Sequence, residues 1–421
     1  MRRCWDHWRQ AGCLLVAVYI LIQAVGTPGQ TAAPVMSATT GLKWVDAWAV
    51  SYLPTTINGT PQTVPIFHNQ TLRLNMFLKL GGAALRVKVT NRFSTQPVVI
   101  GGAHVALRRS AGSPASGPDI VAETNHVLTF GGTGTLKLEA GQEIWSDPVD
   151  LAVKQHQDLA VSLFLPELTT PEAFHPTALK TQYVAAGDHC GDATLPSAGA
   201  GSRTTMYFFV SDVQVLAPAK SKVIVALGDS ITDGATAAND LNAAWPDVLS
   251  KRLPALQDGT PVGIINMGIG SNRLVTADAA GPAGLRRLEE DVLSRPNVSH
   301  LILLEGINDI SYEQAPAEKL IVAYEQVIDR AHAKGIKVIG ATLLPIQNSR
   351  KDTPVNEATR QAVNRWIRDA HRFDAVLDFE KVVQDPQNPL RIRKDLTMDY
   401  VHPNTEGYRL LGESVSLKLF E

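Results

Sequence analysis

The chain has 421 residues, of which 44% are hydrophobic and 19% are charged, and its formal net charge at pH 7 is −2. This composition is typical of a packed globular protein and excludes a largely disordered chain. The near-neutral charge, without a basic block, gives no reason to expect a nucleic-acid partner. A chain of this length exceeds one ordinary domain, so two domains are expected.

The N-terminal residues have the pattern of a secretory signal. Arg2 and Arg3 supply positive charge, residues 13–25 form an apolar stretch, and residues 24–26 are small. We therefore expect a signal peptide at residues 1–26 and a secreted or periplasmic protein. The apolar stretch is short for a membrane span, which needs roughly 20 residues. No stable membrane insertion is expected after signal removal; an uncleaved anchor is the alternative.

The chain contains three cysteines, Cys4, Cys13 and Cys190. The first two lie in the expected signal, so the mature chain would keep only Cys190. A chain with one cysteine forms no internal disulfide, and its stability must come from burial of a core.

Residues 42–216 have the pattern of a β-rich domain. Apolar and polar residues alternate in Leu85–Val89, Leu136–Leu138 and Leu159–Leu163, and turns rich in Gly or Pro separate these runs. No convincing helical period occurs there. Several short strands with frequent turns predict a β-sandwich or a jelly-roll-like domain.

The pattern changes near residues 217–220, which we interpret as a linker. From residue 221 to 421, apolar runs alternate with segments of helical period. Strands are expected at residues 223–227, 262–265, 301–304, 338–343 and 376–377, and helices at residues 317–334, 353–371 and 404–417. This alternation predicts an α/β fold with a parallel sheet covered on both faces.

Ser230 follows the first of these strands, in the run Gly228-Asp229-Ser230-Ile231. Open α/β sheets place their ligands at the carboxyl ends of their strands. Ser230 is therefore a candidate nucleophile, and a polar turn after a strand is the alternative.

Asp399 and His402 stand three residues apart, just before the last helical pattern. A neutral histidine can take the proton of a serine hydroxyl, and a carboxylate can hold the histidine in the required tautomer. Pro403 disfavours helix at His402, so this pair is expected on a loop. A surface histidine that caps the final helix is the alternative.

Two further strand ends carry candidate hydrogen-bond donors. A backbone N–H at Gly270 or Ser271 could face a developing oxyanion, and so could the side-chain amide of Asn308. The alternatives are an ordinary turn between strand and helix, and an asparagine that bonds its own backbone. The carboxyl ends of parallel strands meet at one sheet edge, so these donors are expected near Ser230.

Together these blocks resemble the SGNH, or GDSL-type, hydrolase family. Ser230 matches its nucleophile block, Asn308 its Gly-x-Asn-Asp block, and Asp399 with His402 its Asp-x-x-His block. The resemblance implies a flavodoxin-like, three-layer sheet of about five strands and hydrolysis of esters without a metal or cofactor. It also implies an oxyanion hole formed by the Ser230 N–H, the Asn308 side chain and an N–H of the second block.

The residues Trp245-Pro246 and Gly270-Ser271-Asn272-Arg273 resemble the branch of bacterial xylan-type acetylesterases, whose members often carry an N-terminal β domain. The chain departs from the family in one place. The second block usually reads Gly-Asn-Arg, and Ser271 occupies the glycine position here. Whether Gly270 or Ser271 donates to the oxyanion is therefore left open.

Other polar residues of the chain are less suited to form a site. The run Asp188-His189-Cys190 could suggest a thiol nucleophile or a metal site, but no second cysteine at a useful spacing supports either. Asp233 and Asp309 are expected to support the backbone of their loops. The histidines of the β-rich region are expected to be ordinary surface or packing residues: His104, His126 and His175.

The sequence thus predicts a secreted, two-domain serine esterase with the triad Ser230, His402 and Asp399. The expected substrates are small acyl esters, with acetyl groups on plant-type polysaccharide favoured by the resemblance and by secretion. The alternatives are a lipolytic or lysophospholipid esterase of the same family, a carbohydrate-binding protein with an idle site, and an enzyme that transfers acyl groups to sugars.

Overall fold

The computed structural model describes residues 41–57, 60–109, 117–196, 203–253, 258–276 and 281–421. The expected signal peptide, with Cys4 and Cys13, lies outside the described residues. In the part of the chain that is described, no helix is both long enough and apolar enough to cross a membrane.

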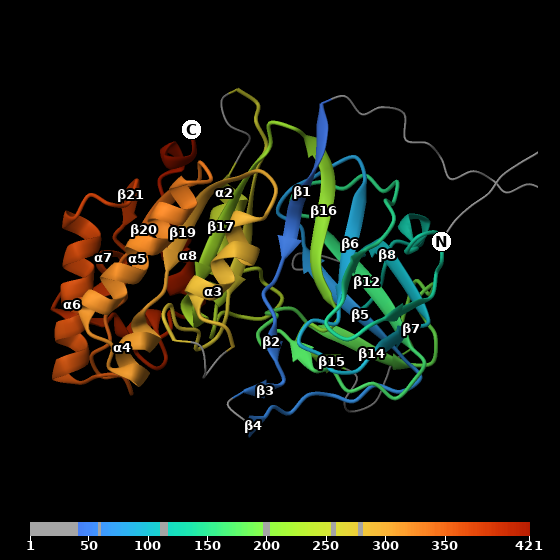
Figure 1. Cartoon of the computed structure of the whole chain (residues 1–421), viewed down its shortest axis with the longest axis horizontal. Helices are drawn as coiled ribbons and strands as arrows, with labels where there is room; N and C mark the ends of the chain where they lie inside the picture. The colour runs from blue at the N-terminus through green and yellow to red at the C-terminus, as the bar shows by residue number, and fades with distance from the viewer. Residues whose placement is uncertain (1–40, 58–59, 110–116, 197–202, 254–257, 277–280) are drawn as a thin grey trace, which may run out of the picture. The chain divides into compact units, whose positions relative to one another are not determined.

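Residues 41–218 are built from antiparallel strands (Figure 1). Among the described residues, one sheet has six strands in the order β15-β14-β5-β12-β8-β9 and a second has four in the order β1-β16-β6-β11. The strand bounds are β1 Leu42–Ala49, β2 Leu53–Pro54, β3 Thr56–Ile57, β4 Thr60–Pro61, β5 Gln70–Phe77, β6 Leu85–Thr90, β7 Val98–Ile100, β8 Gly102–Leu107, β9 His126–Val127, β10 Leu136–Leu138, β11 Glu143–Trp145, β12 Asp158–Leu165, β13 Ala173–Phe174, β14 Gln182–Ala186, β15 Arg203–Thr204 and β16 Val210–Pro218.

The alternating runs of the sequence fall on these strands. In β6, Leu85 and Val87 are buried, whereas Arg86 between them reaches the surface side and lies over the ring of Trp145, 4.5 Å from its centroid. A β-rich N-terminal region is confirmed, and its one described helical turn is the 3₁₀ turn η1 (Ala122–Thr124). The jelly-roll topology stays a prediction.

The C-terminal part contains a five-stranded parallel sheet in the order β18-β17-β19-β20-β21. Its strands are β17 Lys222–Gly228, β18 Val262–Gly268, β19 Val298–Leu304, β20 Lys337–Ala341 and β21 Ala375–Leu377. The first strand lies between the second and the third, which is the doubly wound order of flavodoxin-like sheets. Val223–Leu227 in the interior strand β17 are fully buried, as an apolar run covered on both faces requires.

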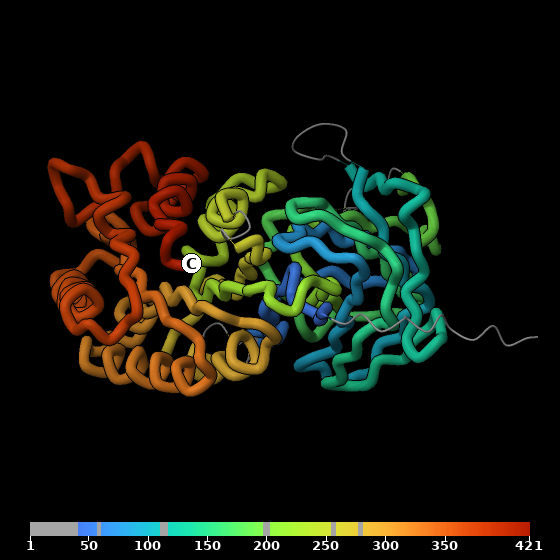
Figure 2. The backbone as a smooth tube through the Cα atoms, turned by 90° about the horizontal axis from the view of Figure 1, so that it is seen from above, coloured from blue at the N-terminus to red at the C-terminus, as the bar shows by residue number. Residues whose placement is uncertain are grey.

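Helices cover both faces of this sheet (Figure 2). Helices α2 and α8 contact each other on one face, and α3, α5 and α6 follow one another in contact on the other. The expected three-layer α/β arrangement is therefore present. The bounds are α1 Ser230–Asp233, α2 Trp245–Arg252, α3 Gly284–Leu288, α4 Ile307–Glu313, α5 Ala317–His332, α6 Pro354–Asp369, α7 Phe379–Val383 and α8 Thr405–Ser414, with the short elements η2 Glu289–Leu293, η3 Lys394–Leu396, η4 Leu417–Phe420, β22 Gln384–Asp385 and β23 Asn388–Ile392.

The ends of the long helices follow from local chemistry. The hydroxyl of Thr353 accepts a hydrogen bond from the N–H of Asn356 at the start of α6, at 3.1 Å, and the side chain of Asn404 does the same for Gly407 in α8, at 3.0 Å. Gly335, with φ of +73°, stands just beyond α5. The three expected helices are confirmed, each ending two or three residues earlier than predicted.

Buried ion pairs connect the β-rich part to the α/β part. Arg295, which follows η2, lies 2.6 Å from Asp212 in β16 and 3.1 Å from Asp46 in β1. Lys79 lies 2.8 Å from Asp247 in α2. These side chains are largely buried, so removal of one partner would leave an uncompensated charge, which is costly.

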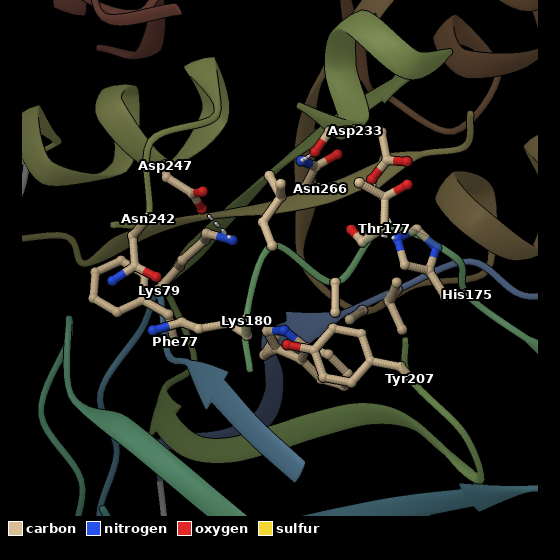
Figure 3. A pocket seen from close by; sticks show the side chains of 15 residues that line it. Phe77, Lys79, His175, Thr177, Lys180, Tyr207, Asp233, Asn242, Asp247 and Asn266 are labelled. Carbon is tan, nitrogen blue, oxygen red and sulfur yellow. Dashed lines mark hydrogen bonds and ion pairs between the residues drawn. The ribbon is translucent and has the colours of Figure 1, made fainter. Parts of the chain in front are cut away.

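His175 belongs to the same boundary and lines a cavity of about 60 Å³ together with Asp233 of α1 (Figure 3). Its Nδ1 lies 2.9 Å from the carbonyl oxygen of Ser51, and its Nε2 lies 3.2 Å from the carbonyl oxygen of Thr177 and 3.2 Å from Oδ1 of Asp233. All three oxygens accept hydrogen bonds when Asp233 is ionised, so the ring must carry both protons. His175 is thus a buried cationic partner of Asp233, a contact that the sequence interpretation missed.

The pKa of His175 agrees with this geometry. Burial lowers the pKa, but the charge and hydrogen bond of Asp233 outweigh burial and raise it above the ordinary value of 6.5. A raised pKa means that the stabilisation is complete below about pH 6.5 and is lost as the pH rises through the pKa of the folded state.

We expect His175→Gln to lower the free energy of unfolding by about 1–3 kcal/mol at about pH 6, because the Asp233 carboxylate loses its partner. The difference from the wild type should shrink at about pH 9. Urea unfolding at both pH values measures it, and His68→Gln, at an exposed position, is the matched control. An equal difference at both pH values would contradict a charged His175.

Candidate active site

Ser230 lies in a tight turn between β17 and the four-residue helix α1. The turn depends on close backbone approach: a Cβ atom on Gly228 would lie 2.3 Å from the carbonyl oxygen of Leu304, and one on Gly268 would lie 2.2 Å from the backbone nitrogen of Asp233. Only glycine fits such gaps. The sequence therefore places the hydroxyl of Ser230 at the carboxyl end of β17.

Asp229 caps the helix that Ser230 begins. Its carboxyl group accepts a hydrogen bond from the N–H of Ile231 at 2.9 Å. Burial raises the pKa of Asp229 to about 7, although this hydrogen bond opposes the rise. The side chain of Asp229, the residue immediately before the candidate nucleophile, thus stabilises the N-terminal turn of α1.

Asp399 and His402 lie on the loop between η3 and α8, as expected. The carboxylate of Asp399 accepts hydrogen bonds from the backbone N–H groups of Val401 at 2.9 Å and of His402 at 2.8 Å. The hydroxyl of Thr397 donates to the carbonyl oxygen of His402 at 2.7 Å. These bonds fold the loop around the carboxylate and hold the imidazole in place.

Ser230, His402 and Asp399 form a hydrogen-bonded chain. Oγ of Ser230 lies 2.9 Å from Nε2 of His402, and Nδ1 of His402 lies 2.7 Å from Oδ2 of Asp399. An ionised Asp399 accepts a hydrogen bond from the N–H of Nδ1, which keeps the proton on Nδ1 and leaves Nε2 free to accept the proton of the Ser230 hydroxyl. This arrangement can activate a serine as a nucleophile.

The electrostatics of Asp399 suit an orienting carboxylate. Partial burial raises its pKa, but the hydrogen bonds from the backbone and ring of His402 and from the N–H of Val401 outweigh burial and hold the pKa below its ordinary value. Asp399 therefore stays ionised at neutral pH. Its side chain is 44% exposed and that of His402 is 12% exposed, so the chain of hydrogen bonds lies at the protein surface.

Asn308 lies in the first turn of α4 and is buried. Gly306 precedes this helix with φ of +128°, and a Cβ atom there would lie 2.7 Å from the hydroxyl of Tyr324. Nδ2 of Asn308 donates to the carbonyl oxygen of Asn272 at 2.9 Å, and its Oδ1 accepts from Nζ of Lys351 at 2.8 Å. One of the two Nδ2 hydrogens is therefore left for another acceptor.

Gly270 and Ser271 lie on the loop that follows β18. Ser271 has φ of +63°, in the left-handed region that glycine enters most easily; this agrees with a position where the family usually has glycine. Among the described residues, no protein group accepts a hydrogen bond from the backbone N–H of Ser230, Gly270 or Ser271. All three stay candidate oxyanion donors.

Asp309 and Arg287 stabilise the loop that follows β18 through hydrogen bonds. Asp309 accepts hydrogen bonds from the N–H groups of Leu274 at 2.8 Å and Val275 at 2.9 Å, so it supports the loop after β18 and not only its own. Arg287 of α3 donates to Oδ1 of Asn272 through Nε at 3.1 Å and Nη2 at 2.9 Å. No local sequence pattern marks Arg287, because its partner lies 15 residues away on another element.

The run Asp188-His189-Cys190 does not have the geometry of a thiol site. Cys190 is buried, and burial raises the pKa of its thiol well above the ordinary value, which disfavours the reactive thiolate. The side chain of Asp188 accepts from the backbone N–H of Cys190 at 3.1 Å. Within the described residues, no group of three or more His, Cys, Asp or Glu side chains could hold a metal ion.

Residues 226–410 match the GDSL-like Lipase/Acylhydrolase family. No curated protein matches the chain.

Solved structures similar to this part of the chain include a protein of the G-D-S-L family from Desulfitobacterium hafniense, with 26% identity, 46% of this chain and 97% of that chain covered, and a TM-score of 0.36. A carbohydrate acetylesterase family member from Sinorhizobium meliloti has 18% identity, with 46% and 94% covered and a TM-score of 0.37. An aryl esterase from M. smegmatis has 16% identity, with 48% and 99% covered and a TM-score of 0.37.

The matched segment contains the nucleophile turn from Ala226 onward, the α4 asparagine, and the Asp-x-x-His loop. Over residues 226–410, the α/β part of this chain is therefore similar to the GDSL-like Lipase/Acylhydrolase family.

Proposed function

We propose that the protein is a secreted serine esterase that removes short acyl groups, above all acetyl groups, from carbohydrate. The observation that carries the proposal is the hydrogen-bonded chain from Oγ of Ser230 through His402 to Asp399, with distances of 2.9 Å and 2.7 Å. It supports a nucleophile, a base and an orienting carboxylate in these three residues.

The reaction proceeds in two steps. Oγ of Ser230 attacks the ester carbonyl while Nε2 of His402 takes the hydroxyl proton, and the tetrahedral adduct collapses as His402 returns that proton to the leaving alcohol. Water then attacks the acyl-serine, gives a proton to His402, and the acid leaves as Oγ regains its proton. Asp399 stabilises the imidazolium that forms in each step.

Negative charge on the carbonyl oxygen needs donors in both steps. The backbone N–H groups of Ser230 and of Gly270 or Ser271, together with the remaining Nδ2 hydrogen of Asn308, supply them in this proposal. Donors fixed before the reaction act more strongly than water, because they need no reorganisation when charge develops.

A polymer-borne substrate is supported by the exposure of the site. Ser230 and His402 are partly exposed and Asp399 is 44% exposed, and an acyl group attached to a polysaccharide can reach only a nucleophile that is open to solvent. The resemblance to acetylesterases and the expected secretion support acetyl groups as the substrate. One observation favours the lipolytic alternative: Met398, beside Asp399, is 82% exposed and could contact a long acyl chain.

Hydrolysis of p-nitrophenyl esters of increasing acyl length tests the substrate class. We expect kcat/KM to be highest for acetate and to fall by about tenfold or more by butyrate, since each methylene changes binding by about 10- to 200-fold in a shaped pocket. Acetate release from acetylated xylan measures the natural reaction. Activity that rises beyond about eight carbons would displace this proposal in favour of a lipolytic esterase.

A fluorophosphonate label distinguishes the enzyme from a binding protein with an idle site. Labelling of Ser230, read by peptide mass and absent in Ser230→Ala, is expected of an activated serine. Binding of polysaccharide without labelling would favour the carbohydrate-binding alternative.

A further inference from the structure

Lys351 is the one buried lysine that contacts a candidate oxyanion donor among the described residues. It lies on the loop between β20 and α6 and is 4% exposed. Its Nζ donates to Oδ1 of Asn308 at 2.8 Å and lies 4.2 Å from the ring centroid of Tyr312 in α4. The side-chain amide of Asn356 donates to its carbonyl oxygen at 2.9 Å, so the backbone that carries Lys351 is also held.

This contact fixes which way the Asn308 amide faces. An ammonium group donates hydrogen bonds and accepts none, so Oδ1 of Asn308 must face Lys351. Nδ2 is then directed to the carbonyl oxygen of Asn272, at 2.9 Å. Without Lys351, only the hydrogen bond from Nδ2 to the carbonyl oxygen of Asn272 would oppose rotation of the amide, and a rotated amide would present its oxygen where the oxyanion needs a donor.

We infer that Lys351 is a positioning residue: it orients the amide of Asn308 as a donor to the oxyanion, and its positive charge beside the amide oxygen makes that amide a stronger donor. The inference rests on the proposed function. Lys351 acts electrostatically, because its positive charge draws electron density toward Oδ1 of Asn308 and makes the Nδ2 hydrogens more positive.

A purely structural role would not explain why a lysine is buried at this position. Burying a cation costs several kcal/mol unless it is paired and hydrogen-bonded. No carboxylate lies within ion-pair distance of Nζ among the described residues; its contacts there are the amide of Asn308 and the ring of Tyr312.

Four charged side chains act on Lys351: Asp229, Arg273, Arg350 and Asp399. Burial lowers its pKa to about 8. Asp229 and Asp399 oppose this decrease, whereas Arg350 and Arg273 add to it. The ammonium form is therefore complete well below pH 8 and is lost as the pH rises through that value. A neutral amine can also accept a hydrogen bond, so it no longer fixes the amide.

The first test is Lys351→Met, assayed on p-nitrophenyl acetate. We expect kcat to fall by about 10- to 100-fold, less than for removal of an oxyanion donor itself, with KM changed by less than about threefold. Arg350→Met removes the neighbouring exposed cation, which does not contact Asn308, and should leave kcat within about twofold. Unchanged kcat in Lys351→Met would overturn the inference.

A double-mutant cycle separates positioning from general support. If Lys351 acts through Asn308, then Lys351→Met should lower kcat by less than about threefold in an Asn308→Ala background, because the amide that it orients is absent. Equal losses in both backgrounds would show that Lys351 acts independently of Asn308 and would overturn the inference.

The dependence of kcat on pH can be measured on the wild type, so this test does not require that a variant folds. We expect a decrease as the pH rises through about 8, and Lys351→Arg, whose charge persists, should move it upward. A flat wild-type profile in this range would overturn the inference even if Lys351→Met does not fold. The proposed function fails separately, if Ser230→Ala keeps its activity.

Discussion

Ser230→Ala is expected to reduce hydrolysis of p-nitrophenyl acetate by at least about 10⁴-fold, because alanine has no oxygen to form the acyl-enzyme. The reduction should appear in kcat, since the substrate can still bind. Oγ of Ser230 makes its one described side-chain hydrogen bond with His402, so the folded state loses little, and the thermal midpoint should stay close to that of the wild type.

A matched control keeps this result specific. Ser294→Ala makes the same substitution at an exposed position, where the hydroxyl contacts Glu289, and should retain full activity. Near-normal turnover in Ser230→Ala would exclude the assigned nucleophile, whatever the other variants show.

Asn308→Ala is expected to lower kcat by about 100- to 1,000-fold, the usual effect of removing one oxyanion donor. KM should change little, because the hydrogen bond strengthens when negative charge develops on the substrate. The measurement is steady-state kinetics on p-nitrophenyl acetate, with circular dichroism to show that the buried position still folds.

Two further variants sharpen this prediction. Asn308→Asp keeps the volume but replaces the donor with a carboxylate that repels the oxyanion, and should be at least as impaired as Asn308→Ala. Asn388→Ala, on β23, removes an amide that contacts Gln347 and should remain active. A fall in kcat of less than about tenfold in Asn308→Ala would remove this residue from the oxyanion hole.

The parallel sheet could be predicted because its signals are local. The apolar run Val223–Leu227 forms a strand wherever it is buried on both faces, and glycines after it permit the tight turn that holds Ser230. Because parallel strands end at one sheet edge, the sequence also predicted that Ser230, Asn308 and the loop after β18 would lie together. The contact between Asp399 and His402 could also be predicted, because the two residues are only three positions apart.

The supporting contacts could not be predicted, since each joins residues that are distant in sequence. Lys351 meets Asn308 across 43 residues, and His175 meets Asp233 across 58. The sequence around a lysine on a loop, or around a histidine among strands, does not indicate which distant residue it will contact. Only the packed fold shows that these groups are buried and which atoms face them.

Helix α1 has Ser230 as its first residue and Asp233 as its last. One turn of backbone therefore joins the hydroxyl of the candidate nucleophile to a carboxylate whose counter-charge, His175, follows β13 in the β-rich part of the chain. A change in the protonation of His175 therefore acts on the carboxylate at the end of the same helical turn that begins with Ser230. The β-rich part of the chain consequently stabilises the helical turn that carries the candidate nucleophile.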